Sequence, residues 1–270
     1  MQIIFNVFIK RQKRRISTAY PLLYLTKNAL FYIINKKTTE CIMSSFTVSP
    51  IGYMRSELPE KFGVPRQSGR APSLLSHIVL IPPYDTEEAF REIEGFSHIW
   101  LLFDFSLARK DGWSATVRPP RLGGNKRVGV FASRSPFRPN HIGLSCVKLV
   151  GLERTKDGLC LKVLGADLLD GTPILDIKPY LPFADCIPTA TGGYAAEREH
   201  YRLKVDFPLA LQAQIPEEKR EGLIECLADD PRPSYHDDIT RIYGMAFGGY
   251  QIRFRVERDT LYVVDVQKTM

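Results

Sequence analysis

Two pairs of charged residues have types and spacings that could bind a small polar ligand. Arg134 and Arg138 flank the triplet Ser-Pro-Phe, and a planar guanidinium group can hold a carboxylate or phosphate through two parallel hydrogen bonds. Asp167 and Asp170 flank two leucines just before Gly-Thr-Pro. Their carboxylates could accept hydrogen bonds from ribose hydroxyls or an ammonium group, or cap backbone N–H groups in a turn. The spacing leaves both interpretations open, and the alternative for the arginines is a pair of solvated loop residues.

The two arginines lie in a basic stretch, rich in Pro and Gly, at residues 116–145. It contains six Lys/Arg residues, Lys148 follows, and no acidic residue occurs from 112 to 152. Because Pro fixes φ and Gly allows positive φ, loops of this composition can hold a shape without a helix or sheet. The apolar run at 128–132 predicts a short buried strand between two cationic loops. Loops on a rigid scaffold are a common place for binding residues.

The net charge of +7 does not by itself indicate a nucleic-acid-binding protein. Residues 1–42 hold eight Lys/Arg and one acid and so carry the whole excess, while residues 43–270 hold 29 of each sign. Only the local basic patch at 109–138 therefore favours a polyanionic partner. No run approaches the roughly 20 apolar residues needed to span a bilayer.

Common nucleotide-binding and nucleophile motifs are absent from the sequence, which has no GxGxxG, no P-loop and no GxSxG. The five cysteines form no CxxC pair and the five histidines lack the spacing of metal ligands. We therefore expect no metal, and reduced thiols in a cytoplasmic protein. Phe137, Tyr180 and Tyr194 could stack on a base, although aromatic side chains more commonly pack in a core.

Residues 43–190 alternate between short β-strands and turns. Strands are predicted at 46–54, 77–81, 96–105, 144–152, 159–164 and 174–182. The apolar strand at 96–105 is expected to be buried on both faces, and the turn at 156–158 pairs the two strands beside it. A capping-box pattern at Asp85 predicts a helix that ends near Gly95. Many short strands between turn signals predict a mainly β fold with a closed or nearly closed β-barrel.

The composition changes near Ala190, and residues 191–270 predict a small C-terminal α+β domain. A helix is predicted at 216–229, with its apolar face formed by Leu223, Ile224 and Leu227. Residues 250–257 alternate strictly between apolar and polar, and a turn leads to a second strand at 261–266. A unit of about 70 residues is close to the lower size for an independent core. We expect it to pack on the barrel or on a second subunit.

Residues 1–42 do not follow the order of a secretory signal, because charges interrupt their apolar runs. We expect a poorly ordered leader, or an over-long start, with the folded unit beginning at Met43. A basic arm that contacts membrane or nucleic acid is the alternative.

Eight motifs, in order along residues 43–270, closely resemble those of the TrmO/YaeB (TsaA-like) family. They are EKFGVPRQ (60–67), FSHIW (96–100), VRPPRLGGN (117–125), GVFASRS (129–135), RPN with IG (138–143), DGTP (170–173), DIKPY (176–180) and DPRP (230–233). The resemblance implies a tRNA methyltransferase that uses S-adenosyl-L-methionine and has a β-barrel catalytic domain. It also implies a homodimer that methylates N6 of threonylcarbamoyladenosine at position 37, beside the anticodon.

The resemblance further implies which residues contact S-adenosyl-L-methionine. They are Pro65, Arg66, Gln67, His98, Ile99, Arg134, Leu144, Asp167, Leu168, Leu169 and Asp170. In this interpretation, residues 129–135 form a barrel strand that delivers Arg134 to the cofactor. His141 departs from the family pattern, in which many members have Pro, so its loop has one rigid residue fewer.

The threonyl carboxylate of such a substrate makes Arg118, Arg121 and Arg138 candidate substrate-orienting residues. Residues 118–127 and 138–140 would then face the RNA. We assign no general base, although N6 has a delocalised lone pair and its proton must be removed. The alternatives are a non-enzymatic sensor or adaptor that binds adenosylmethionine or RNA, and a hydrolase that uses His98 or His141 with an aspartate.

Overall fold

The computed structural model of the chain describes residues 47–109, 112–119, 126–198, 200–233 and 238–269. The chain divides into two compact units, Met1–Val48 and Ser49–Met270, and every described helix and strand belongs to the second unit. The expected leader at 1–42 lies outside the described residues. None of the described helices is long and apolar enough to cross a membrane.

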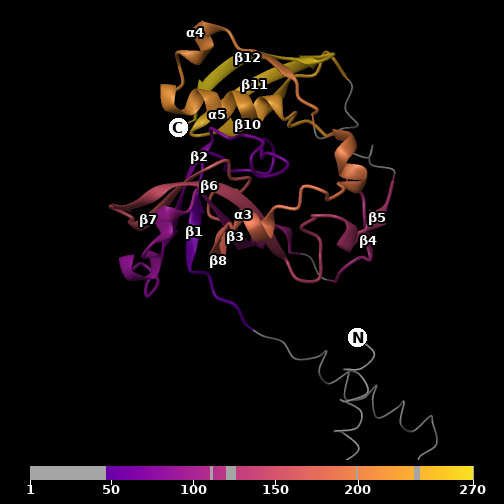
Figure 1. The fold of residues 1–270 in the computed structure, drawn as a ribbon. Coiled ribbons are helices and arrows are strands. Elements are labelled where there is room, and N and C mark those ends of the chain that lie inside the picture. The colour runs from indigo at the N-terminus through magenta and orange to yellow at the C-terminus, as the bar shows by residue number, and fades with distance from the viewer. Residues whose placement is uncertain (1–46, 110–111, 120–125, 199, 234–237, 270) are drawn as a thin grey trace, which may run out of the picture. The chain divides into compact units, whose positions relative to one another are not determined.

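Six antiparallel strands form a closed sheet in the order β1-β2-β7-β6-β3-β8 (Figure 1). They are β1 (Gly52–Arg55), β2 (Leu75–Leu80), β3 (His98–Asp104), β6 (Ile142–Thr155), β7 (Gly158–Leu164) and β8 (Pro173–Pro179). The sheet closes because β8 pairs with β1, with Ile174 opposite Gly52. The prediction of a mainly β chain is confirmed, and pairing of the two end strands is what closure of a barrel requires.

The hairpin of β6 and β7 is confirmed. Its strands pair from Lys148–Leu164 to Thr155–Gly158, and the turn residue Gly158 has φ +119°, which favours glycine. Along β6, Gly143, Ser145 and Val147 are buried while the residues between them are more exposed. This alternation places one row of β6 side chains inside the closed sheet and the other row outside.

The strand predicted at 96–105 exists as β3, but burial on both faces is wrong. Ile99, Leu101 and Phe103 are buried, whereas the residues between them are half-buried and His98 is exposed. A closed sheet has one interior face, so a nearly continuous apolar run does not require two buried faces.

Two predicted boundaries near the start also need correction. Of the strand predicted at 46–54, the described residues from 47 on form a strand over Gly52–Arg55, after Pro50, which has no N–H to donate to a ladder. The helix predicted at 85–95 is two short 3-10 helices, Glu87–Phe90 and Ile93–Gly95, and no side chain caps either. Glu92 separates them with φ +69°, a left-handed conformation that ends a right-handed helix.

The apolar run at 128–132 is not a barrel strand. Strand β5 (Val128–Gly129) pairs only with β4 (Thr116–Val117), in a separate two-stranded ribbon, and a 3-10 helix follows at Val130–Ala132. Both the N–H and the hydroxyl of Ser133 donate to the Val130 carbonyl, at 3.2 and 2.8 Å, and close this turn. Arg134 is therefore carried by a loop, not by the predicted strand at 129–135. Another 3-10 helix, Ser106–Ala108, precedes the ribbon.

The C-terminal region contains a four-stranded sheet in the order β10-β11-β12-β9. Its elements are β9 (Lys204–Asp206), α4 (Leu209–Gln212), α5 (Glu217–Ala228), β10 (Tyr243–Phe247), β11 (Tyr250–Glu257) and β12 (Thr260–Lys268). The connection from β8 carries α3 (Pro182–Asp185) and the 3-10 helix Gly193–Arg198. The predicted helix and the two predicted strands correspond to α5, β11 and β12, and they are confirmed.

The segment before β2 packs in the C-terminal core, although it is far from it in sequence. Leu58 and Leu74 share a buried cluster with Leu223 and Phe254. A Cβ on Gly222 would lie 3.0 Å from the Leu74 Cα, so α5 approaches this segment closely. The side chain of Glu225 accepts hydrogen bonds from the backbone and hydroxyl of Ser73, at 2.7 and 3.1 Å. These contacts join α5 to the chain just before β2.

We predict that Gly143→Ala destabilises the fold. Gly143 faces Phe103 across the β3–β6 ladder, and a Cβ there would lie 2.2 Å from the Phe103 Cζ. Because the Phe103 ring is buried and packs against Phe105 with centroids 4.9 Å apart, it cannot move away freely. We expect a loss of about 1–3 kcal/mol in the free energy of unfolding, measured with urea.

Gly151→Ala, on the same strand, is the matched control, because its Cβ would meet no atom within 4 Å. Equal stability of the two variants would contradict the prediction.

Candidate functional site

Three of the predicted cofactor-binding residues converge beside the closed sheet. Arg134 Nη1 donates to Gln67 Oε1 at 2.6 Å, and Ser145 Oγ donates to Asp167 Oδ1. The positive charge of Arg134 and the backbone N–H of Ser68 also lie near Asp167. We call Gln67, Arg134, Ser145 and Asp167 the Arg–Asp cluster. It places an amide, a guanidinium, a hydroxyl and a carboxylate within one small region.

Burial sets the electrostatic character of Asp167. It raises the pKa of this carboxyl above the usual range, while the Ser145 hydroxyl and the Arg134 charge act in the opposite direction. The ionised carboxylate is thus solvated less well than it would be in water. A ligand that brings a hydroxyl or ammonium donor would therefore gain a strong hydrogen bond here.

The loop that carries Gln67 is held in place by a buried carboxylate of the C-terminal region. Asp229, at the end of α5, is 3% exposed. It accepts from the Arg66 N–H at 2.8 Å and from Arg70 Nε at 2.7 Å. The Gly69 N–H donates to the Gly165 carbonyl at 2.9 Å. The loop is thus fixed on both sides of Gln67, which sets the position of this side chain relative to Arg134.

The predicted cofactor residues next to Gln67 and Asp167 in the chain make contacts that hold the core or the backbone. Pro65 is buried, and Arg66 Nη2 donates to the Arg232 carbonyl at 3.0 Å. Leu168 is buried in the core of the closed sheet. The Leu169 carbonyl accepts from Thr172, and Asp170 Oδ1 accepts from the Ser56 N–H at 3.1 Å. Asp170 therefore takes the backbone-capping role that the sequence had left open.

The remaining predicted cofactor residues lie elsewhere on the closed sheet. Ile99 is fully buried in the core, whereas His98 and Leu144 are exposed on the outward rows of β3 and β6. His98 Nδ1 shares a hydrogen bond with the Ser97 hydroxyl at 2.9 Å. Leu144 directly precedes Ser145 of the cluster, and the two side chains point to opposite faces of β6.

Two of the three candidate substrate-orienting arginines can be placed. Arg118 is exposed directly after β4. Arg138 is half-buried, and its Nη1 donates to the Ser133 carbonyl at 3.2 Å. Arg121 lies outside the described residues. The carbonyl of His141 accepts from the Phe105 N–H at 2.8 Å, so the chain is anchored where the family pattern has Pro.

The three predicted stacking aromatics differ in their surroundings. Tyr180 lies against Trp100, with centroids 5.7 Å apart, and the Tyr194 hydroxyl donates to the Ala132 carbonyl at 2.9 Å. Phe137 is exposed. Tyr194 therefore supports the 3-10 helix that precedes Arg134.

Ser145 belongs to the cluster but was not among the predicted site residues. Its signal is readable in the sequence, because β6 alternates and Ser145 is a polar residue in the inward row. Asp229 was also missed. It lies more than 160 residues from Arg66 in the chain, and no local pattern indicates that pairing.

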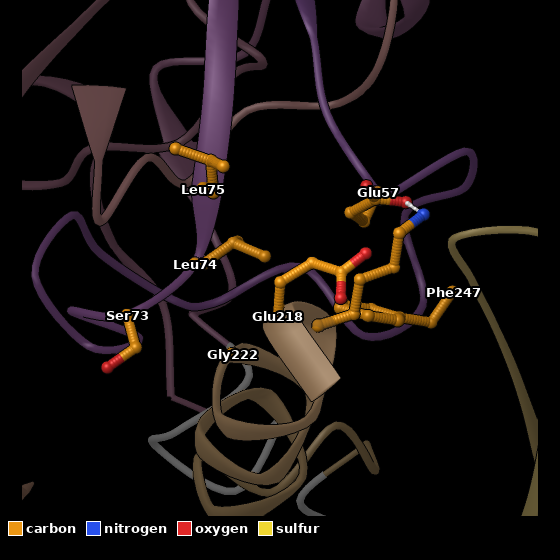
Figure 2. A pocket seen from close by; sticks show the side chains of 8 residues that line it. Glu57, Ser73, Leu74, Leu75, Glu218, Gly222 and Phe247 are labelled. Carbon is orange, nitrogen blue, oxygen red and sulfur yellow. Dashed lines mark hydrogen bonds and ion pairs between the residues drawn. The ribbon is translucent and has the colours of Figure 1, made fainter. Parts of the chain in front are cut away.

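A cavity beside α5 is too small to be a cofactor site. Its volume is about 50 Å³, and Glu57, Leu74, Glu218 and Phe247 are among the residues that line it (Figure 2). Sites for small molecules are typically about 300 Å³ or larger. Lys219 Nζ pairs with Glu57 Oε2 at 2.8 Å at its edge. Within the described ranges, no group of three or more His, Cys, Asp or Glu side chains is arranged to hold a metal ion.

Two family models match the chain. The model of the tRNA-methyltransferase O N-terminal domain matches residues 53–186, and the model of the TrmO C-terminal domain matches residues 200–269. The first range contains the whole Arg–Asp cluster, and the second contains Asp229.

Relatives that are similar over most of their length agree with these matches. The chain is 45% identical to the tRNA (adenine(37)-N6)-methyltransferase of Escherichia coli K12, over 79% of this chain and 94% of that protein. It is 42% identical to a Pseudomonas aeruginosa protein named as a candidate S-adenosylmethionine-dependent methyltransferase, over 82% of this chain and 97% of the relative.

A solved structure shares the fold as well as the sequence. The crystal structure of TrmO from Pseudomonas aeruginosa superposes with a TM-score of 0.67 at 37% identity, covering 83% of this chain and 100% of that one. The chain belongs to the tRNA-methyltransferase O (TrmO) family.

Proposed function

We propose that this chain is a tRNA methyltransferase that uses S-adenosyl-L-methionine to methylate N6 of the adenosine at position 37. The observation that carries the proposal is the Arg–Asp cluster, in which Arg134 contacts Gln67 beside the half-buried Asp167. Membership of the TrmO family and the activity named for the E. coli relative support it.

The residues of the cluster fit the polar groups of the methyl donor. S-Adenosylmethionine supplies an electrophilic methyl group together with a carboxylate, an ammonium group and ribose hydroxyls. Arg134 would hold the carboxylate, and Asp167 would accept from the ammonium or a ribose hydroxyl. Ser145 keeps the Asp167 carboxylate oriented through its hydrogen bond. We keep His98, Ile99 and Leu144 as predicted contacts elsewhere on the closed sheet.

We propose that the substrate adenosine carries the threonylcarbamoyl group. Its carboxylate would meet Arg118 or Arg138, and Arg121 remains a candidate. The acceptor nitrogen must lie about 3–3.5 Å from the methyl carbon and lose its proton during transfer. No side chain of the cluster is assigned as the base.

We further propose that the enzyme acts as a homodimer. The closed sheet would be its β-barrel catalytic domain, at residues 43–190, and residues 191–270 a small second domain. Phe183 on α3 is 87% exposed and is an aromatic side chain available for a contact between two copies. Because tRNA works at the ribosome, we place the enzyme in the cytoplasm.

The activity test uses the purified protein, S-adenosylmethionine and tRNA that carries threonylcarbamoyladenosine. We expect this nucleoside to gain one methyl group, detected by mass spectrometry of the digested tRNA. The same tRNA without the threonylcarbamoyl group is the control, and we expect it to remain unmethylated. Binding of adenosylmethionine without methyl transfer would instead favour the sensor or adaptor.

We predict that Arg134→Ala weakens adenosylmethionine binding by about 10- to 150-fold, since it removes a hydrogen bond to a charged group. Arg134→Lys keeps the charge but loses the planar fork, and its affinity should fall between those of Arg134→Ala and the wild type. Isothermal titration calorimetry measures both. Arg91→Ala is the control, because Arg91 is exposed and pairs with nearby Glu88. Wild-type affinity in Arg134→Ala would remove this role from Arg134.

We predict that Asp167→Asn stabilises the free protein at neutral pH while weakening cofactor binding. Burial raises the pKa of Asp167 in the folded state, so folding favours its protonated form and wild-type stability falls as the pH rises. The free energy of unfolding of Asp167→Asn should begin to exceed that of the wild type above the ordinary aspartate pKa of about 4. The difference should stop growing once the pH is above the raised pKa of the folded state. Urea unfolding between about pH 3.5 and 8 measures it. A variant less stable than the wild type at neutral pH would contradict the argument.

A further inference from the structure

Two exposed aromatic rings lie against each other on the basic ribbon. Trp113 is 59% exposed and Phe131 is 73% exposed. Their ring centroids are 6.4 Å apart and their planes are tilted by 35°. Large aromatic side chains contribute most when buried, so an exposed pair contributes little to the fold. A contiguous apolar surface of this kind marks a place where another molecule binds.

The backbone beneath these rings is held by several hydrogen bonds. The Val130 N–H donates to the Ala115 carbonyl at 2.9 Å, and Thr116 pairs with Gly129 across the ribbon. Arg127 Nε donates to Thr116 Oγ1 at 2.7 Å. Val130 is buried, while the adjacent Phe131 faces solvent. The backbone that leads into Phe131 is therefore held in place, and little of its conformational freedom remains to be lost on binding.

Positive charge predominates around the pair in the sequence, although Asp111 lies two residues before Trp113. No acidic residue occurs from 112 to 152, and Arg118, Lys126 and Arg127 are exposed on the ribbon. The nearest acid along the chain that the structure describes, Asp104, is paired with Arg109. Aromatic faces beside cationic side chains are the combination that binds single-stranded nucleic acid. Protein–protein interfaces are also enriched in aromatic residues and Arg but are depleted of Lys, and Lys126 is exposed beside this pair.

The aromatic pair is also connected directly to the Arg–Asp cluster. Phe131 precedes Arg134 by three residues, and Arg134 contacts Gln67. We propose that Trp113 and Phe131 form a stacking platform for an unpaired base of the RNA substrate, in the anticodon loop of the tRNA. This proposal rests on the proposed function, and it adds a site for RNA distinct from the residues assigned to the cofactor.

The test compares variants that remove a ring with variants that keep one. Trp113→Ala and Phe131→Ala should each bind an anticodon stem-loop RNA about 5- to 150-fold more weakly, the range for loss of one base–aromatic stack. Trp113→Phe and Phe131→Tyr should stay close to wild type in affinity. Leu209→Ala is the matched control, because Leu209 is a strongly exposed apolar residue on α4. Fluorescence anisotropy at fixed salt measures the dissociation constants.

A second readout locates the stack. The stem-loop is prepared with an abasic site at each loop position in turn. At one loop position, the abasic site should weaken binding to the wild type by the same factor as the ring removal. The same abasic site should cause no further loss of affinity in the Trp113→Ala, Phe131→Ala double variant. Tryptophan fluorescence should be quenched by the RNA in the wild type and not in Trp113→Phe.

Each outcome separates this proposal from the proposed function. Ring-removal variants that bind the RNA as tightly as a methylating wild type would overturn the platform and leave the function standing. Loss of adenosylmethionine affinity would assign the rings to the cofactor, and loss of self-association alone would assign them to a dimer contact. Either result overturns the proposal. If the wild type transfers no methyl group but its RNA binding still depends on the two rings, the platform is supported and the proposed function fails.

Discussion

The buried carboxylate of Asp229 is the interaction on which the arrangement of the site depends. An ionised group with 3% exposure is unfavourable unless hydrogen bonds replace its water. Asp229 meets this requirement with the Arg66 N–H and the Arg70 guanidinium. Both donors belong to the loop that carries Gln67, so satisfying the carboxylate also fixes the loop. The C-terminal region thereby shapes a site whose other residues come from the closed sheet and its connections.

Closure of the sheet imposes the second constraint. Only one row of side chains on each strand can face the interior, and the space there is limited. Phe103 on β3 fills part of that space, and the residue opposite it on β6 is Gly143, which has no side chain. Two residues further along β6, Ser145 is the polar member of the inward row. Its hydroxyl bonds Asp167, which follows β7 in the chain. Burial at the end of this apolar interior raises the pKa of Asp167, and the Ser145 hydroxyl acts in the opposite direction.

Local patterns predicted the elements that depend on local sequence. The hairpin of β6 and β7, helix α5 and the pair β11–β12 each have strict periodicity or a clear turn. The strand at β5 was wrongly predicted to belong to the barrel. Its end is set by the hydrogen bonds of Ser133 and its pairing by Thr116, and neither contact leaves a periodic pattern in the sequence. In the site, Arg134 and Asp167 stood out as charged residues in rigid surroundings. That the two residues belong to one site was implied only by the family resemblance. Ser145 could have been found from alternation, while Asp229 could not, since nothing local pairs it with Arg66.

The short chain between Phe131 and Arg134 limits how far apart the two substrates can be. Three residues of extended chain span at most about 11 Å, and here a 3-10 turn makes the segment more compact. Ser133 and Tyr194 both bond carbonyls of this turn, so its ends cannot shift independently. Methyl transfer requires the acceptor nitrogen within about 3.5 Å of the methyl carbon and in line with the breaking bond. Under the proposed function, a base stacked on Phe131 and a cofactor held by Arg134 are placed by one rigid turn. The distance between them is then set by covalent geometry, and flexible side chains need to supply only the final alignment.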